Sequence, residues 1–136
     1  MASVVTDLGH GVTVALMIGG TTEPKYIGWG TGAGTAASTD TTLFSEKDVD
    51  LTTASGTRTT GTSSQTTTTN TGDTYQVTGT RTATGSGTVT NAGLWTNATI
   101  GSGTLFAKSD SASWSTGSVA LVSGDSIAFT FKVKQA

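Results

Sequence analysis

Few side chains in this sequence could carry out chemistry, and the one histidine is the first to consider. His10 lies between Gly9 and Gly11 near the N-terminus. A Ser-His-Asp arrangement needs a histidine that is held rigidly and oriented by a carboxylate. A histidine between two glycines lacks such support, so we interpret His10 as a mobile surface residue.

Carboxylates are the next candidates, because groups of them bind calcium or hydrolyse glycosidic bonds. Asp48 and Asp50 would share one face of a strand and could offer oxygen ligands to Ca²⁺. Two carboxylates do not complete a site and the EF-hand pattern is absent, so an ordinary solvated face is the simpler interpretation. Glu23 and Glu46 could pair with aspartates as in glycoside hydrolases, but any β domain with nine acidic residues allows such pairs.

A glycine-rich stretch is the third candidate. Residues 28–33, Gly-Trp-Gly-Thr-Gly-Ala, match the dinucleotide-binding pattern G-x-G-x-x-A. That pattern binds phosphate only where a helix follows, and residues 35–42 make a poor continuous helix. We interpret the stretch as a turn in which backbones approach closely. We therefore expect no catalytic residues, no cofactor and no metal, and hence no enzyme.

The composition limits the remaining functions. The chain has 136 residues, a formal charge of −2, no cysteine and only 34% hydrophobic residues. This size suits one domain, and the small amount of apolar material suggests that neighbouring subunits contribute to stability. The basic residues are scattered, which argues against nucleic-acid binding. The apolar run at residues 12–18 is too short to span a membrane and lacks a basic leader, so we expect a soluble chain.

The elements that must position these residues are strands, and the clearest is residues 124–134. After a Gly-Asp turn, large apolar residues fall on every second position: Ile127, Phe129, Phe131 and Val133. A period of two puts all four on one face, so this pattern predicts a half-buried strand against which the core forms.

Residues 57–84 are dominated by threonine and predict a long protruding hairpin, with its turn at residues 70–73. In the second arm Tyr75, Val77 and Ala83 share one face and threonines the other. Threonine favours extended backbone and offers a hydroxyl for cross-strand hydrogen bonds, so such a hairpin needs little burial. The alternative for residues 57–69 is low-complexity disorder.

Weaker patterns complete the chain. Further strands are expected at residues 12–18, 26–29, 88–95, 104–108 and 119–122, and one helical turn within 38–46. Residues 1–11 are interpreted as an N-terminal arm and residues 12–136 as a single β domain. About eight short strands without a useful amphipathic helix predict an all-β fold, an antiparallel β-sandwich or barrel of jelly-roll-like type.

Three stretches, in this order, resemble a family of small virion structural proteins of tailed bacteriophages. They are residues 24–36 with 40–44, residues 89–95 (Val-Thr-Asn-Ala-Gly-Leu-Trp) and residues 123–133. Members are called capsid decoration or cement proteins in some phages and tail-fibre-like proteins in others. The likeness covers most of the chain outside the Thr-rich hairpin.

The resemblance implies a non-enzymatic protein, made in the host cytoplasm, that sits on the capsid exterior of the virion. It implies a homo-oligomer, a trimer, bound to the major capsid protein, with neither nucleic acid nor membrane as partner. A tail-fibre or receptor-binding module, in which Trp29, Trp95, Trp114 or Tyr75 stacks on sugars, is the alternative. A glycan hydrolase is a third hypothesis.

Candidate interface residues follow from position alone. The N-terminal arm, with Ser3, Asp7 and His10, could reach a capsid subunit. Tyr26 and Trp29 could lie at a subunit junction, because the neighbouring glycines allow close approach. Burial within one subunit is the simpler interpretation for both aromatic residues.

Overall fold

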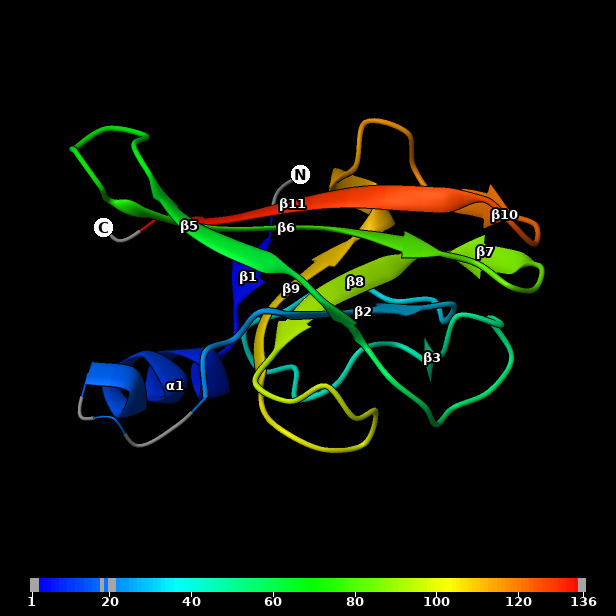
Figure 1. Cartoon of the computed structure of the whole chain (residues 1–136), viewed down its shortest axis with the longest axis horizontal. Coiled ribbons are helices and arrows are strands. Elements are labelled where there is room, and N and C mark those ends of the chain that lie inside the picture. The colour runs from blue at the N-terminus through cyan, green and yellow to red at the C-terminus, as the bar shows by residue number, and fades with distance from the viewer. Residues whose placement is uncertain (1–2, 18, 20–21, 135–136) are drawn as a thin grey trace.

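Two antiparallel β-sheets pack face to face in the computed structural model, which describes residues 3–17, 19 and 22–134 (Figure 1). The prediction of an all-β, sandwich-like fold is therefore confirmed, although the sheets do not close into a barrel. The strands are β1 (Val4–Val5), β2 (Tyr26–Gly30), β3 (Glu46–Lys47), β4 (Thr59–Thr60), β5 (Thr62–Thr66), β6 (Thr74–Thr82), β7 (Gly87–Val89), β8 (Asn91–Trp95), β9 (Leu105–Asp110), β10 (Val119–Leu121) and β11 (Ser126–Lys134).

The first sheet has the order β1-β9-β8-β2-β3, with β4 also paired to β2, and the second has the order β11-β6-β5. A short β10-β7 pair stands beside them. Apolar side chains from both sheets meet in one main cluster that includes Trp29, Leu94, Val77 and Phe131. The sheets enclose a shared core, which is what makes a sandwich stable.

β11 faces the core as its alternating pattern predicts. Phe129, Phe131 and Val133 are buried, Ile127 is half-buried, and the residues between them are exposed. β11 pairs along its whole length with β6, from Ser126 opposite Thr82 to Lys134 opposite Thr74.

A Thr-rich hairpin is confirmed, but it spans β5 and β6 (residues 62–82) and not the predicted 57–84, because residues 59–60 form β4 and pair with β2 of the first sheet. The alternative of disorder for residues 57–69 is not what the structure shows. β5 pairs with β6 from Thr62 opposite Thr78 to Thr66 opposite Thr74. The tip of this hairpin extends away from the sandwich at the upper left of Figure 1. Arg81 shares the inward face of β6 with Val77 and Ala83, although it is charged.

The N-terminal prediction is wrong. Residues 12–17 belong to a helix, α1 (Asp7–Met17), and not to a strand, and residue 18 lies outside the described residues. Residues 3–11 are correspondingly no simple arm, since they contain β1 and the start of α1. The Thr6 hydroxyl accepts a hydrogen bond from the Gly9 N–H (2.9 Å), which is an N-cap, and the cap outweighs the strand preference of valine and threonine.

α1 packs on β9 through a very close approach at Gly9. A Cβ atom at this position would lie 2.1 Å from the Phe106 carbonyl oxygen. Val12, one turn further along, is buried in the main core. No helix in the described part of the chain has the length and apolar character to cross a membrane.

The glycine-rich stretch forms β2 and an extended segment after it. Gly28 lies opposite Gly93 on β8, and a Cβ at Gly28 would meet the Glu46 carboxylate at 2.4 Å. At Gly28 the glycine thus makes room for the Glu46 side chain, whereas close approach of backbones, as the sequence suggests, applies at Gly30, where a Cβ would collide with the Phe44 carbonyl oxygen. Residues 38–46 form turns and the start of β3 without the expected helical turn, because the Asp40 carboxylate binds the Ala37 N–H (3.0 Å) and fixes a tight turn there.

Candidate functional site

The three N-terminal candidates lie in different surroundings. Ser3 is half-buried beside a small groove of about 100 Å³ that Lys108 and Asp110 also line. Asp7 and His10 are exposed on α1, and the Asp7 N–H donates to the Ser38 carbonyl (2.7 Å). Leu8 and Leu16 are exposed on the same helix, at 45% and 37%. The structure thus leaves Asp7 and His10 accessible to a partner but does not gather them into one site.

The two aromatic candidates are not exposed in the same way. Trp29 has no accessible surface, and its Nε1–H donates to the Asp48 carbonyl (3.0 Å). Tyr26 is half-buried against a second small apolar cluster that contains Leu43 and Trp95. Burial within one subunit, the simpler interpretation of the sequence, therefore describes Trp29 fully and Tyr26 in part.

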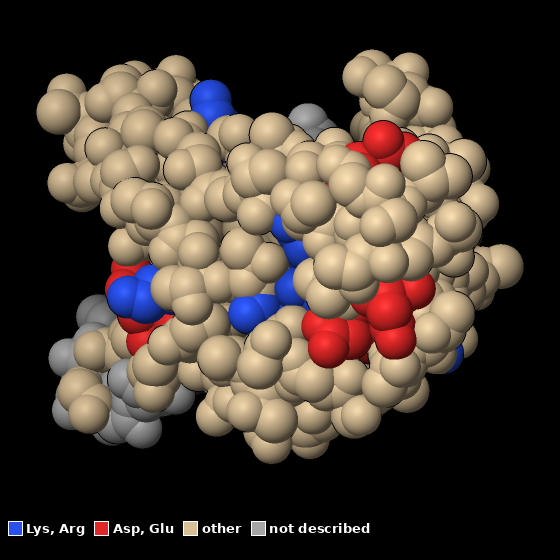
Figure 2. Space-filling view, turned by 45° about the vertical axis from the view of Figure 1, so that its right-hand side comes forward, with Lys and Arg blue, Asp and Glu red and all other residues tan. Residues whose placement is uncertain are grey.

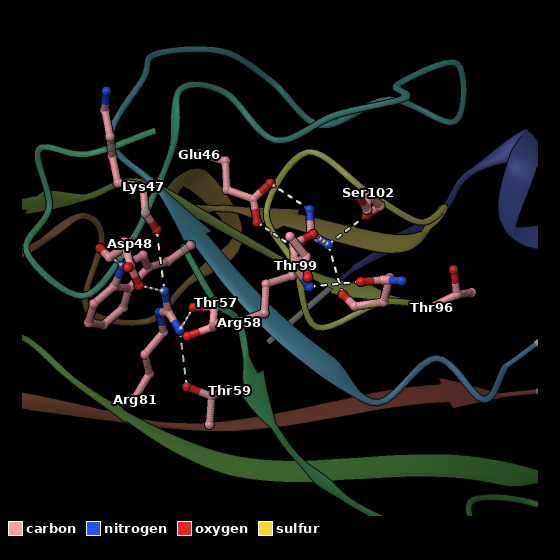
Figure 3. Close-up of polar contacts among 12 residues, drawn as sticks. Glu46, Lys47, Asp48, Thr57, Arg58, Thr59, Arg81, Thr96, Thr99 and Ser102 are labelled. Atoms are coloured by element: carbon pink, nitrogen blue, oxygen red, sulfur yellow. Dashed lines mark hydrogen bonds and ion pairs between the residues drawn. The ribbon is translucent and has the colours of Figure 1, made fainter. Parts of the chain in front are cut away.

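A buried ionic network is the most elaborate polar feature of the fold, and the sequence analysis missed it (Figure 3). Arg58, whose side chain has no accessible surface, donates from Nε and Nη2 to both carboxylate oxygens of Glu46, at 2.7 and 3.0 Å. Its Nη1 donates at 2.8 Å to the carbonyls of Asn97, Thr99 and Ser102. The guanidinium also stacks 3.8 Å above the Trp95 ring. One cation thereby fixes the whole loop between β8 and β9.

A second arginine repeats this arrangement from the other sheet. Arg81 on β6 donates from Nη1 to the Thr57 carbonyl (3.0 Å) and pairs through Nη2 with Asp48 (3.3 Å). It lies 5.0 Å from the Trp29 ring centroid. Burial lowers the pKa of Arg81, and the nearby Asp48 and Glu46 carboxylates oppose that effect. Arg81 therefore ties the segment that carries β3 and β4 to the second sheet.

Lys108 forms a third buried ion pair on the far side of the first sheet. Its fully buried ammonium donates to Asp40 (2.9 Å) and to the Thr42 carbonyl (2.9 Å), and it lies 3.1 Å from the Phe44 ring centroid. Burial would raise the pKa of Asp40, but the hydrogen bond and charge of Lys108 outweigh it and lower this pKa. The pair holds the long segment between β2 and β3 against β9.

One signal in the sequence could have revealed part of this network. Arg81 has the same parity as Val77 and Ala83 in a predicted strand, so its side chain had to point inward with them. An inward arginine requires a carboxylate or carbonyl partner. No comparable pattern marks Arg58, whose acceptors are spread from residue 46 to residue 102.

The candidate calcium ligands Asp48 and Asp50 are occupied by the protein itself. Asp48 pairs with Arg81, and the Asp50 carboxylate accepts from the Thr52 and Thr53 N–H groups at 2.9 and 2.8 Å. The Thr53 hydroxyl also donates to Asp50, and this hydrogen bond has the largest effect. Together these hydrogen bonds hold the pKa of Asp50 well below its usual range. Among the described residues no group of three or more His, Cys, Asp or Glu side chains could hold a metal ion. In the structure Asp50 therefore caps a turn, and Asp48 is the partner of Arg81.

The hairpin tip is organised by one partly exposed carboxylate. Asp73 accepts from the N–H groups of Thr68 (2.8 Å), Thr69 (3.0 Å) and Asn70 (2.9 Å). These backbone bonds, that of Asn70 foremost, hold the pKa of Asp73 well below its usual range. An open groove of about 420 Å³ lies along the same hairpin, and its lining includes Gln65 and Tyr75. Serine and threonine side chains line it beside the Tyr75 ring, and the Asp73 carboxylate in its lining is bound to the backbone of the tip.

The one partly exposed tryptophan lies at a second groove. Trp114 follows a short 3₁₀ helix (Ser111–Ser113), and its Nε1–H donates to the Ser109 hydroxyl (2.8 Å). Together with Val119, Ile127 and Phe129 it lines an open groove of about 290 Å³ beside β11. Of the four aromatic residues considered for sugar stacking, Trp29 and Trp95 are buried and Tyr75 is half-buried, with its hydroxyl bonded to the Pro24 carbonyl (3.0 Å).

Charge is sparse on the surface that Figure 2 shows. Basic atoms occupy a recess near the centre of this face, with acidic side chains beside it, and most of the remaining surface is neither acidic nor basic. A continuous basic band of the kind that tracks a phosphate backbone does not cross this face.

Comparison of the chain with protein-family models, with curated proteins and with solved structures finds no match.

Proposed function

We propose that this protein is a non-enzymatic structural component of a tailed-bacteriophage virion. In this proposal it is a capsid decoration protein that binds the major capsid protein on the outside of the head, as a homotrimer. It is made in the host cytoplasm and remains on the capsid exterior. The proposal starts from the resemblance of three ordered sequence stretches to that family.

The observation that carries the proposal is where those stretches lie. The glycine-rich stretch contains β2, and the Asn-Ala-Gly-Leu-Trp segment is β8, which pairs with β2 so that Gly28 faces Gly93. The third stretch contains most of β11, whose apolar face fills the opposite side of the core. The resemblance therefore concerns the residues that build both sheets.

The physical character of the fold supports the same function. Buried ion pairs fix the connecting segments on the sandwich, which gives a rigid body with little surface charge. Such a body can contact several capsid subunits at a junction, where weak contacts add through multivalency.

Cryo-electron microscopy of the virion tests this function directly. We expect density that fits this sandwich on the outer shell, at positions where capsid subunits meet. Capsids prepared without the protein should lose their DNA at a lower temperature, and adding the purified protein should restore the original temperature. Density on the tail alone would contradict the proposal.

A receptor-binding module of the tail is the second candidate, and one observation favours it. Trp114 is partly exposed at an open groove, which is the setting in which an indole stacks on a sugar ring. Binding of the isolated protein to a glycan array, lost on Trp114→Ala, would support this function over the capsid function.

A further inference from the structure

β11 forms an outer edge of the second sheet and has a partner on one side only. Its nine residues pair with β6, and no other strand of the described residues continues the sheet beyond it. In Figure 1 it runs as the red strand along the top of the sandwich. An edge of this length presents a row of backbone groups that can pair with another strand.

The register shows which backbone groups are free. The Ala83 N–H donates to the Asp125 carbonyl (2.7 Å), immediately before β11 begins. Hydrogen-bonded pairs alternate in an antiparallel ladder, so the odd-numbered residues of β11 bond to β6. The hydroxyls of Thr82 and Ser126 lie 2.6 Å apart, as expected for a non-bonded pair, in which side chains are closer. The N–H and C=O groups that point outward therefore belong to Ser126, Ala128, Thr130, Lys132 and Lys134.

Common protections of an edge strand are missing over most of β11. The strand contains no proline, and no irregularity interrupts its register with β6. Its two lysines both lie at the C-terminal end. Beside its N-terminal half, Trp114, Val119 and the half-buried Ile127 line the groove of about 290 Å³. This half of the edge is accessible through the groove, whose lining also includes Ser115, Thr116 and Thr130.

We propose that β11 binds β11 of a second copy of this chain, antiparallel, about a two-fold axis at Thr130. In this register Ala128 lies opposite Lys132 of the second copy, and Ser126 opposite its Lys134. Even-numbered residues then face even-numbered residues, so every outward N–H and C=O along the strand meets a complementary group. The result is one continuous antiparallel sheet with three strands from each copy.

The charges of the strand favour this occupant. Asp125 precedes β11 and the two lysines end it, so antiparallel pairing brings the acidic end of each copy to the basic end of the other. Neither lysine faces a lysine in this register. Asp125 has the parity of the inward-facing residues and the lysines point outward, so the opposite charges come near each other without a direct cross-strand contact. The register also avoids a lysine–lysine contact, which would be unfavourable.

The apolar face also continues across the axis. Ile127 lies opposite Val133 of the second copy, and Phe129 opposite Phe131 of the second copy. Ile127 is half-buried and Phe129 is already buried, so the apolar surface that the second copy newly covers at the groove is mainly that of Ile127. This contact goes beyond the proposed capsid function and does not depend on it. A trimer would use a different surface.

A single-cysteine variant tests the position of the axis. The chain has no cysteine, so Thr130→Cys introduces one thiol at the point where the two copies meet. We expect mild oxidation to give a disulfide-linked dimer, because directly opposite residues lie within the Cα separation that a disulfide spans. The matched control is Thr80→Cys, exposed on the same face but one strand further in. Equal cross-linking of both variants, or of neither, would overturn the proposal.

A pair of charge variants tests the register without cross-linking. Ala128 is exposed, and its neighbour Thr80 within the copy is neutral, so a charge placed there makes no new pair inside one chain. Ala128→Glu should lower the dimer dissociation constant and Ala128→Lys should raise it. Each change should be roughly two- to thirty-fold, because the two-fold axis places residue 128 opposite Lys132 of the other copy twice in each dimer. Sedimentation equilibrium measures both, with Thr80→Glu and Thr80→Lys as controls. A wild-type chain that is monomeric at every accessible concentration, or an oligomer that neither Ala128 variant alters, would overturn the proposal.

Discussion

Two regions of this protein fix irregular backbone with charged side chains, and they do so in opposite environments. Around Arg58 the charges are buried: the arginine side chain has no accessible surface and Glu46 has 11%. At the tip of the Thr-rich hairpin the Asp73 carboxylate is solvated and accepts hydrogen bonds from three consecutive N–H groups. Both regions hold a loop in one shape.

This difference in solvent exposure predicts what each region loses when its charged side chain is removed. A buried cation has been taken out of water together with its acceptors, so its loss leaves most of those acceptors without a donor. When a solvated carboxylate is removed, the N–H groups that donated to it can donate to water instead. The buried region should therefore affect the stability of the whole fold, and the tip only its own order.

Arg58→Met gives the largest expected effect. The substitution leaves the Glu46 carboxylate and the Asn97 and Ser102 carbonyls without their donor, while the Thr99 carbonyl keeps the Ser102 N–H (3.1 Å); the cost is about 3–5 kcal/mol in the free energy of unfolding. Urea unfolding followed by tryptophan fluorescence measures this loss. The double variant Arg58→Met, Glu46→Gln should recover part of it, because the unpaired charge is gone. A loss below about 1 kcal/mol would show that water reaches this site and that the two regions do not differ.

The strands of this fold could be predicted from the sequence, whereas the ionic network could not. The alternation in β11 and the threonine pattern of the hairpin each show which side chains share one face of a strand. Such patterns involve only residues that are close together in the sequence. Arg58 and its acceptors come from β3, the segment before β4 and the loop after β8, and no local pattern links them. The helix α1 was missed for a different reason. Its segment is rich in valine, threonine and glycine, which are weak helix formers, so its composition did not favour a helix.

The candidate interface was predictable only in part. The sequence placed Asp7 and His10 in an accessible N-terminal segment, and both are exposed. It could not decide between exposure and burial for Trp29, because that depends on Asp48 and Arg81 reaching the indole from elsewhere in the chain. The pairing of these residues with a partner stays a prediction.

Acid should loosen the hairpin tip at Asp73 and, in the same way, the turn that Asp50 caps. Hydrogen bonds hold the pKa values of Asp73 and Asp50 in the folded protein below the ordinary value of 3.8. For a lowered folded pKa, the contribution to stability is complete above the unfolded pKa and is lost as the pH falls toward the folded pKa. Protection of the Thr68, Thr69 and Asn70 amides from hydrogen exchange should therefore fall below about pH 4, after correction for the intrinsic rate. Constant protection down to about pH 2 would contradict this assignment.

Asp73→Asn should have a smaller and local effect at neutral pH. Oδ2 of Asp73 accepts from Thr69 and Asn70, and an amide nitrogen at that position cannot accept. We expect lower amide protection at the tip with little change in the urea midpoint of the whole protein. Thr71→Ala, at an exposed position of the same tip, is the control and should leave protection unchanged. A large fall in the midpoint would mean that the tip is coupled to the core.

Lys25→Ala should have the smallest effect, and it separates burial from charge as the cause of the difference. The Lys25 ammonium lies 3.4 Å from the Glu23 carboxylate, with side chains 34% and 38% exposed, so solvent screens the pair. The expected cost is below about 0.5 kcal/mol, and Glu23 keeps the Tyr75 hydroxyl as a donor at 3.2 Å. Urea unfolding at low and high salt measures this cost. If Lys25→Ala cost as much unfolding free energy as Arg58→Met, the cost would follow from the loss of a charge and not from its burial. That result would contradict the proposed difference between the two regions.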